Sequence, residues 1–550
     1  MSNFKREVTS VKRYFLKLAA SAALLGALVI PQAAFAAAPA PSLHDDNPSG
    51  KFGDWYTGAV PANADTSKPV ILFVQGLHSD YTTWYNSGDD YYDAAFNAGY
   101  RTAFVQLKDA DGGGGDMWTN GSALADVIRK VSAYYGGAKI NIIAHSKGGI
   151  DTQTALDYYG AYPYVNVVHQ LSTPNRGSEL ADLSYGSWTW WLGWIMGQQD
   201  DAVYSLQTSY MSNFRSWTDG LTENNYTRTY MSNGTGDDGW FSAYWYAHAV
   251  LPGSDDGAVA QYSALGLPNG IYSFTDNGSE KLSHTAMRYA SKTWWQVRPK
   301  LTSTTFAALP TPSLSASANK TQLEGGSIVI PPEYSSNLML GGTINGLTSN
   351  TFSLESGLNS TTVDVMTASS ATDVELVAPS GNVYKPSKAQ SVGETAMMFD
   401  KASHNVFNIS KPEKGTWTMR AAGTDDAYFL LAQLDGGPQA KVTTKKKQLN
   451  AKKDLTTSFT LNLEGGKGKT LVTNGKLVAA KKQGGHNSIL SNVEIKQDAS
   501  GAYNAVFATP TTPGVYNVSF DVTGVKDNGE EFTRSVNYNF AVTDESGSVK

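Results

Sequence analysis

The chain has 550 residues, more than one hydrophobic core can serve, so two to four domains are expected. Its formal net charge of −6 offers no basic field for nucleic acid, and the absence of cysteine excludes disulfides, thiolate catalysis and cysteine-bound zinc. Hydrophobic residues make up 41% and charged residues 17%, which is typical of a globular protein in water.

The first 36 residues have the pattern of an export signal. Basic residues lie before an apolar run at residues 18–30, and Ala34-Phe35-Ala36 supplies a small-x-small cleavage site. The run is shorter than the roughly 20 residues that a membrane span needs. We therefore expect residues 1–36 to be removed as a signal peptide and the protein to act outside a bacterial cell; an uncleaved anchor is the alternative.

The region at about 42–306 alternates between strand and helix patterns. An apolar run at residues 70–74 ends in Gln-Gly, as a central parallel strand does, and residues 123–135 have helical spacing. Further strands are predicted at residues 101–107, 140–143 and 165–168. This alternation predicts a mostly parallel sheet with helices on both faces. An aromatic-rich stretch at about 183–250 predicts a cap over a cleft, or the core of a small helical subdomain.

A strand, a tight turn and a helix are predicted around Ser146. This turn lifts the serine hydroxyl to the end of the sheet and aims the backbone N–H of Lys147 at the atom under attack. The strict form of the motif has glycine where this chain has Ala144, which adds only a methyl group. A second oxyanion donor is expected in the loop after the earlier central strand, at the N–H of Leu77. His78, in the same loop, is expected to line the cleft.

A serine nucleophile needs a base and an acid that orients the base, and both follow it in the chain on this type of sheet. His284, in a loop before an amphipathic helix, is preferred as the base. His169 lies in a strand pattern and His248 in an aromatic run, so both are less favoured. Two adjacent carboxylates in one glycine-bounded loop are candidates for the acid; Asp256 is chosen and Asp255 is the alternative.

Five segments occur here in the order typical of secreted bacterial lipases and esterases of the α/β-hydrolase superfamily, which the first region resembles. They are residues 74–77, 144–149, 171–178, 254–259 and 283–284. The resemblance implies the α/β-hydrolase fold, with Ser146 as nucleophile, Asp256 and His284 as its partners, and Leu77 and Lys147 as oxyanion donors. Such lipases usually carry histidine at position 75 and often methionine at 147, so the lysine beside the nucleophile leaves the preferred ester open.

The composition changes beyond residue 306. Residues 307–320 are rich in proline, serine and alanine and read as a linker, and 12 of the 13 tryptophans lie before residue 300. Period-two alternation with turn signals then predicts two all-β sandwich-like domains, at residues 321–436 and, Ig-like, at 437–550. The lysine-rich stretch at 441–482 has two interpretations: a solvated sheet edge, which is favoured, and docking on anionic polymer or lipid.

The sequence thus predicts a secreted serine hydrolase of carboxylic esters, either a triacylglycerol lipase or a carboxylesterase, acting on lipid at an interface. Two alternatives stay open: an extracellular polyester depolymerase, and a non-catalytic protein that binds a cell surface or polymer. The triad chemistry calls for no cofactor or metal. Structural calcium is left open, and no nucleic-acid partner is expected.

Overall fold

The computed structural model divides the chain into two units, Met1–Ala37 and Ala38–Lys550. It describes residues 37–86, 88–111, 113–188, 199–237, 247–301, 322–323, 326–327, 333–390, 402–443, 446–468, 473–480, 488–497, 499 and 502–549. The predicted signal peptide, the predicted linker and parts of the predicted cap lie outside these residues. Among the helices described, none is long and apolar enough to cross a membrane.

An eight-stranded sheet forms the core of the first region, in the order β1-β2-β4-β3-β5-β6-β7-β8. Neighbours from β4 to β8 are parallel, whereas β2 pairs antiparallel with both β1 and β4. The strands are β1 (Ser42–His44), β2 (Trp55–Thr57), β3 (Ile71–Val74), β4 (Thr102–Val105), β5 (Ile140–His145), β6 (Val165–Leu171), β7 (Arg228–Asn233) and β8 (Ile271–Thr275). The mostly parallel sheet predicted from the sequence is confirmed.

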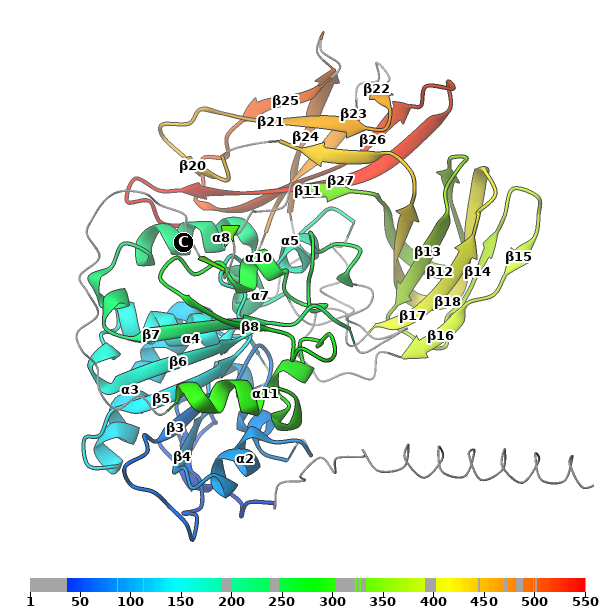
Figure 1. The fold of residues 1–550 in the computed structure, drawn as a ribbon. Coiled ribbons are helices and arrows are strands. Elements are labelled where there is room, and N and C mark those ends of the chain that lie inside the picture. Colours follow the sequence, from blue (N-terminus) through cyan, green and yellow to red (C-terminus); the bar gives the residue numbers. More distant parts are fainter. Residues whose placement is uncertain are drawn as a thin grey trace, which may run out of the picture. The chain divides into compact units, whose positions relative to one another are not determined.

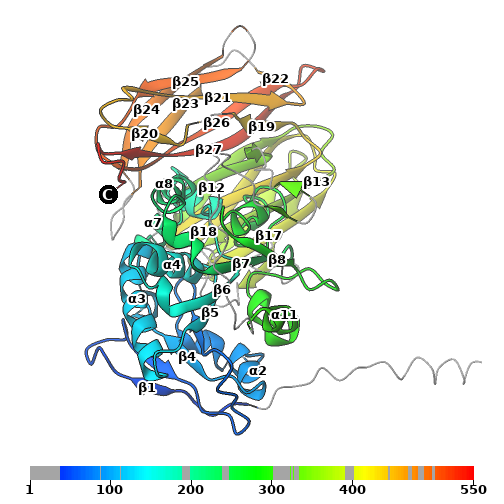
Figure 2. The same ribbon diagram turned by 60° about the vertical axis from the view of Figure 1, so that its left-hand side comes forward.

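Helices cover both faces of this sheet (Figures 1 and 2). On one face, α3 (Met117–Tyr134), together with Ala155 and Leu156 just after α4 (Gly148–Gln153), buries apolar residues of β3, β4 and β5. On the other face lie α2 (Tyr91–Asn97) and α11 (Ala290–Val297), where the ring of Tyr91 packs edge-on against Trp294. Helix α3 begins six residues before the predicted start because Asp116 caps it, accepting a hydrogen bond from Thr119 N at 2.8 Å.

Four further helices lie beyond the carboxyl ends of the strands. They are α5 (Glu179–Ser184), α7 (Asp201–Ser205), α8 (Thr208–Thr218) and α10 (Gln261–Ala264). In both ribbon views α7 and α8 lie between the parallel sheet and the C-terminal strands, and Figure 1 shows α5 in the same layer (Figures 1 and 2). We call α5, α7 and α8 the cap helices; they fall inside the predicted cap at 183–250 except for the first part of α5.

A seven-stranded antiparallel sheet follows, in the order β15-β14-β18-β13-β17-β16, with β12 paired to β18. Its two longest strands change register between Ile344 and Gly346, where glycine adopts φ +76° and the ribbon bends. The strands are β12 (Asn337–Leu354), β13 (Ser360–Thr367), β14 (Asp373–Val377), β15 (Val383–Tyr384), β16 (Ser387–Gln390), β17 (Ser403–Ser410) and β18 (Gly415–Asp435). The bent sheet encloses its own apolar core around Trp417.

The last sheet has ten strands, in the order β11-β19-β21-β25-β24-β23-β26-β27-β20, with β22 paired to β26. They are β11 (Glu333–Ser335), β19 (Gln439–Val442), β20 (Gln448–Asn450), β21 (Thr456–Glu464), β22 (Lys467–Gly468), β23 (Thr473–Ala479), β24 (Ser488–Gln497), β25 (Tyr503–Ala508), β26 (Gly514–Val525) and β27 (Glu531–Thr543). A separate small hairpin joins β9 (Gln322–Leu323) and β10 (Gly326–Ser327).

The β-rich character predicted for both C-terminal regions is confirmed, but each is built on one curled sheet with its own core. In addition, β11 lies before the predicted boundary at residue 436 and yet pairs with β19 in the last sheet. Period-two alternation marks which face of a strand is buried, but it does not say which strand is the neighbour.

Candidate active site

Ser146 lies at the turn between β5 and α4, in a left-handed backbone conformation with φ +54°. Its N–H donates to Leu171 O at 2.9 Å, which ties the turn to β6. Two glycines make this turn possible. A Cβ at Gly148 would lie 2.2 Å from Gln75 O, and one at Gly76 would lie 2.9 Å from the Cβ of Ser146. The close packing predicted from the sequence therefore holds the serine at the carboxyl end of the sheet.

Asp256 and His284 meet beside this turn. His284 Nδ1 lies 2.9 Å from Asp256 Oδ2, and both side chains are buried. The other carboxylate oxygen accepts hydrogen bonds from Ala258 N at 3.0 Å and Val259 N at 2.8 Å. The backbone N–H of His284 also donates to Asp256 O at 2.9 Å. The acid is thus fully hydrogen-bonded, and it fixes the plane of the imidazole.

The alternative acid, Asp255, has a different partner. It lies 2.5 Å from His248 Nδ1 and accepts a hydrogen bond from Gly257 N at 2.8 Å. His248 also contacts Asp237 at 3.1 Å. The structure therefore pairs each of the adjacent carboxylates with a different histidine.

Ser146, His284 and Leu77 line one cavity of about 40 Å³. The rest of its wall is mostly apolar and comes from the loop after β6, from α5 and α7 with their capping residues, and from the loop that carries Asp256. These residues are Pro174, Ser178, Leu180, Ala181, Val203, Leu206, Ala258 and Val259. The arrangement brings a hydroxyl, an oriented imidazole and the predicted oxyanion loop to the same small apolar space.

The side chain of Lys147 has no place in this cavity. It is completely buried, and its Nζ donates to Asp151 Oδ1 and Oδ2 at 3.0 and 2.9 Å. Asp109 Oδ2 lies 3.5 Å from the same nitrogen. Two carboxylates in the interior hold the ammonium group, so the side chain of Lys147 does not line this cavity. Its influence on the preferred ester stays a prediction. His78 is likewise absent from the lining and contacts Asp200 at 2.6 Å.

His145 makes a contact with His284 that was not predicted from the sequence. Its Nε2 donates to the backbone carbonyl of His284 at 2.9 Å, and the two ring centroids lie 4.6 Å apart. Burial, reinforced by His284 and Arg288, lowers the pKa of His145 well below its ordinary value. A neutral imidazole with a proton on Nε2 therefore supports the backbone of His284. Only its position before Ser146 could have drawn attention to it.

His169 is packed in the core of the sheet, as expected. It lies on β6, is 1% exposed and stacks on Tyr230 with 5.0 Å between ring centroids. Burial, with a smaller effect of Lys300, lowers its pKa to about 3. Neither His169 nor His248 lines the Ser146 cavity.

No family model and no curated protein matches the chain. Among solved structures, it is similar to the Bacillus licheniformis lipase BlEst2 in its propeptide form, with 26% identity and a TM-score of 0.70. That alignment covers 91% of this chain and 99% of the lipase. The mature form of the same lipase aligns at 35% identity with 46% of this chain and 99% of its own length, with a TM-score of 0.41.

A metagenomic carboxyl esterase, MGS0156, aligns at 15% identity over 44% of this chain and 78% of its own, with a TM-score of 0.32. The likeness to the propeptide-form lipase, which extends over 91% of this chain, supports an ester-hydrolase function at the level of the lipase and esterase class.

Proposed function

We propose that the protein is a secreted serine hydrolase that cleaves carboxylic esters through an acyl-enzyme intermediate. Ser146 would be its nucleophile, His284 its base and Asp256 its triad acid. The observation that supports this most is the buried Asp256–His284 pair, 2.9 Å apart, next to a serine held in a left-handed turn in the same cavity.

Each step then has an assigned group. Asp256 keeps the proton of His284 on Nδ1, so that Nε2 takes the proton of the Ser146 hydroxyl as it attacks the ester carbonyl. The N–H groups of Leu77 and Lys147 stabilise the oxyanion of the tetrahedral intermediate. The imidazolium gives its proton to the departing alcohol, and water, activated by the same imidazole, releases the acid.

The apolar cavity favours an uncharged acyl group. Leu180, Ala181 and Val203 of the cap helices line the cavity, so we propose that a triacylglycerol enters when these helices move. We propose a carboxylesterase or lipase acting on lipid esters. A polyester depolymerase is the second candidate, because the aromatic-rich stretch of the sequence at about 183–250 would also suit a polymer surface.

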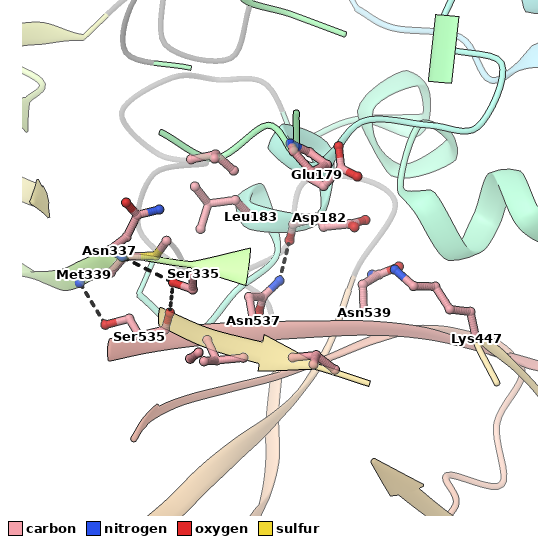
Figure 3. Close-up of a pocket in the computed structure, with 15 residues that line it drawn as sticks. Glu179, Asp182, Leu183, Ser335, Asn337, Met339, Lys447, Ser535, Asn537 and Asn539 are labelled. Carbon is pink, nitrogen blue, oxygen red and sulfur yellow. Dashed lines mark hydrogen bonds between the residues drawn. The ribbon is translucent and has the colours of Figure 1, made fainter. Parts of the chain in front are cut away.

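The C-terminal strands contact the outer side of the cap helices. Asn539 Oδ1 accepts from Ser209 N at 3.0 Å, and Val515 N donates to the hydroxyl of Tyr204 at 3.0 Å. Figure 3 shows Asn537 and Asn539 facing Glu179 and Asp182 across a pocket at this surface. The lipase that aligns over 91% of this chain is in a propeptide form. We propose that the C-terminal regions hold the cap helices closed over the Ser146 cavity. Binding of a cell surface or polymer is the alternative role of these regions.

A fluorophosphonate probe tests the central proposal. The wild-type chain should be labelled once, at Ser146, and should hydrolyse p-nitrophenyl acetate. The Ser146→Ala variant should take up no probe and lose hydrolysis. A folded wild-type chain that neither reacts with the probe nor cleaves any ester in a panel graded by chain length would instead favour the non-catalytic surface-binding protein.

A further inference from the structure

A charged cluster lies in the interior behind the proposed oxyanion donors. Lys147, Asp109 and Asp151 are each at most 2% exposed. The ammonium group of Lys147 contacts both carboxylates, at 2.9 Å for Asp151 and 3.5 Å for Asp109. The cluster thus places one positive and two negative groups out of contact with water, directly beside the turn that carries Ser146.

Asn120, on α3, joins the two carboxylates. Its Nδ2 donates to Asp109 Oδ2 at 2.6 Å and to Asp151 Oδ2 at 3.1 Å. Its Oδ1 accepts from Lys108 N at 3.2 Å, so the amide is held at both ends. The four side chains come from α3, α4, the turn at Ser146 and the loop after β4, and they form one connected network.

Asp109 alone of the two acids also touches the loop that carries Leu77. Its Oδ1 accepts a hydrogen bond from the backbone N–H of His78 at 3.2 Å. His78 adopts φ +51°, a left-handed conformation that needs support in a residue other than glycine. One carboxylate therefore contacts the residue after Leu77 through one oxygen, and the side chain of Lys147 through the other.

Burying these charged groups costs free energy, because they lose their contacts with water. A stabilising role alone therefore does not explain the network. Burial raises the pKa of Asp151 to about 7. Burial also disfavours the ammonium form of Lys147, but Asp109 and Asp151 more than offset this and raise its pKa. Well-packed apolar residues often stabilise a core as well as a buried ion pair does, so a buried network of this kind is weak evidence for a stabilising role.

We propose that Asp109 is a positioning residue that sets the separation and direction of the two oxyanion donors, Leu77 N and Lys147 N. It touches no substrate; it acts by holding the His78 peptide and the Lys147 side chain on one rigid carboxylate. This inference rests on the proposed ester-hydrolase function. It adds to that function a reason why lysine follows the nucleophile in this chain.

The test compares three buried acids in the full-length chain. Asp109→Ala removes both contacts, Asp109→Asn keeps an acceptor for His78 N, and Asp151→Ala removes a partner of Lys147 that does not touch the loop. Asp157→Asn is the matched control, because this acid is buried in the turn after α4 but outside the network. Thermal unfolding shows whether each variant folds.

With p-nitrophenyl acetate, Asp109→Ala should lower kcat by about 10- to 100-fold while KM changes less than about threefold, since a misplaced oxyanion donor weakens only the transition state. Asp109→Asn should lose activity by an intermediate factor, because its amide oxygen still accepts from His78 N but its NH2 group faces Lys147 and Asn120. Asp151→Ala should lose clearly less than Asp109→Ala, and Asp157→Asn should match wild type. The affinity for phenylboronic acid, a mimic of the tetrahedral anion, should fall in parallel with kcat across the series.

The inference is overturned if Asp109→Ala keeps wild-type kcat, or if Asp109→Ala and Asp151→Ala lose the same activity in proportion to their lost stability. If Asp109→Ala does not fold, Asp109→Asn decides: wild-type kcat together with wild-type affinity for phenylboronic acid in that variant overturns the inference. Failure of the proposed function looks different: the wild-type chain itself would then cleave no ester, or would do so equally well after Ser146→Ala.

Discussion

The hydrolase region and the first β region each contain a buried histidine–aspartate pair, and the two pairs have nearly the same geometry. His284 Nδ1 lies 2.9 Å from Asp256, and His404 Nδ1 lies 2.7 Å from Asp364. All four side chains are at most 2% exposed. The first pair contributes His284 to the lining of a cavity that also contains Ser146, a serine at a strained turn. None of the cavities described, within the residues that the structure covers, is lined by His404 or Asp364. A buried pair is therefore not a site in itself; the surrounding groups decide what it can do.

The largest expected effect on activity distinguishes His284 from His404. His284→Ala should lower kcat/KM for p-nitrophenyl acetate by about 10⁴-fold or more, because it removes the base from a unit that works together. His404→Ala should leave the activity of the folded fraction within a fewfold of wild type. It should lower the free energy of unfolding instead, since it leaves Asp364 buried without this partner.

Steady-state kinetics and chemical unfolding of both variants check this comparison. The interpretation of the hydrolase pair fails if His284→Ala keeps substantial activity. A loss of activity in folded His404→Ala that is as large as in His284→Ala would show that the pair in the β region also takes part.

The next largest expected effect on activity distinguishes Asp256 from its neighbour Asp255. Asp256→Asn should reduce kcat by about 10⁴-fold, because the amide would orient the wrong tautomer of His284. Asp255→Asn should cost far less, since its partner is His248. The rate at which the fluorophosphonate probe labels Ser146 gives the reactivity of the nucleophile in each variant. The order of the two losses would be reversed if Asp255 were the triad acid.

A third histidine shows what burial does without a carboxylate partner. Neither ring nitrogen of His169 has a hydrogen-bond partner in the part of the chain that the structure describes, and its pKa falls to about 3. The unfolded chain takes up this proton below about pH 6.5. The folded chain resists it until about pH 3, so this residue makes the free energy of unfolding fall as the pH drops through that window.

The slope from this one residue is at most about 1.4 kcal/mol per pH unit. Urea unfolding of wild type and His169→Phe at pH 7, 5 and 4 measures it. The phenylalanine variant should lose less stability toward low pH. Identical pH dependence in both proteins would mean that His169 is hydrated or paired in solution.

The smallest effect concerns the surface where the last sheet meets the cap. Asn539→Ala removes hydrogen bonds to Ser209 N at 3.0 Å and to Gln207 Oε1 at 3.2 Å. We expect a loss of about 1 to 2 kcal/mol in the attachment of this sheet, and hence faster limited proteolysis of the C-terminal region. The released hydrolase should gain more on emulsified triacylglycerol than on p-nitrophenyl acetate. Unchanged proteolysis would show that other contacts hold the sheet.

Much of the fold could be predicted from local patterns in the sequence. The apolar runs at residues 70–74 and 140–143 and the glycines around Ser146 are enough to predict parallel strands and the serine turn, because burial and close packing restrict which residues can stand there. The chain order of Ser146, Asp256 and His284 likewise predicted the groups that meet at one cavity. Their catalytic roles stay predictions until the variants are measured.

Contacts between segments that are distant in the sequence could not be predicted from local patterns. The sequence by itself determined the strands, the turn at Ser146 and the alternation of the C-terminal strands, since these depend on neighbours within a few residues. Tertiary structure alone decided that Lys147 points into the interior toward Asp109, and that β11 joins the last sheet. The physical reason is that a buried charge or an edge strand takes whichever partner the packed chain brings within hydrogen-bonding distance.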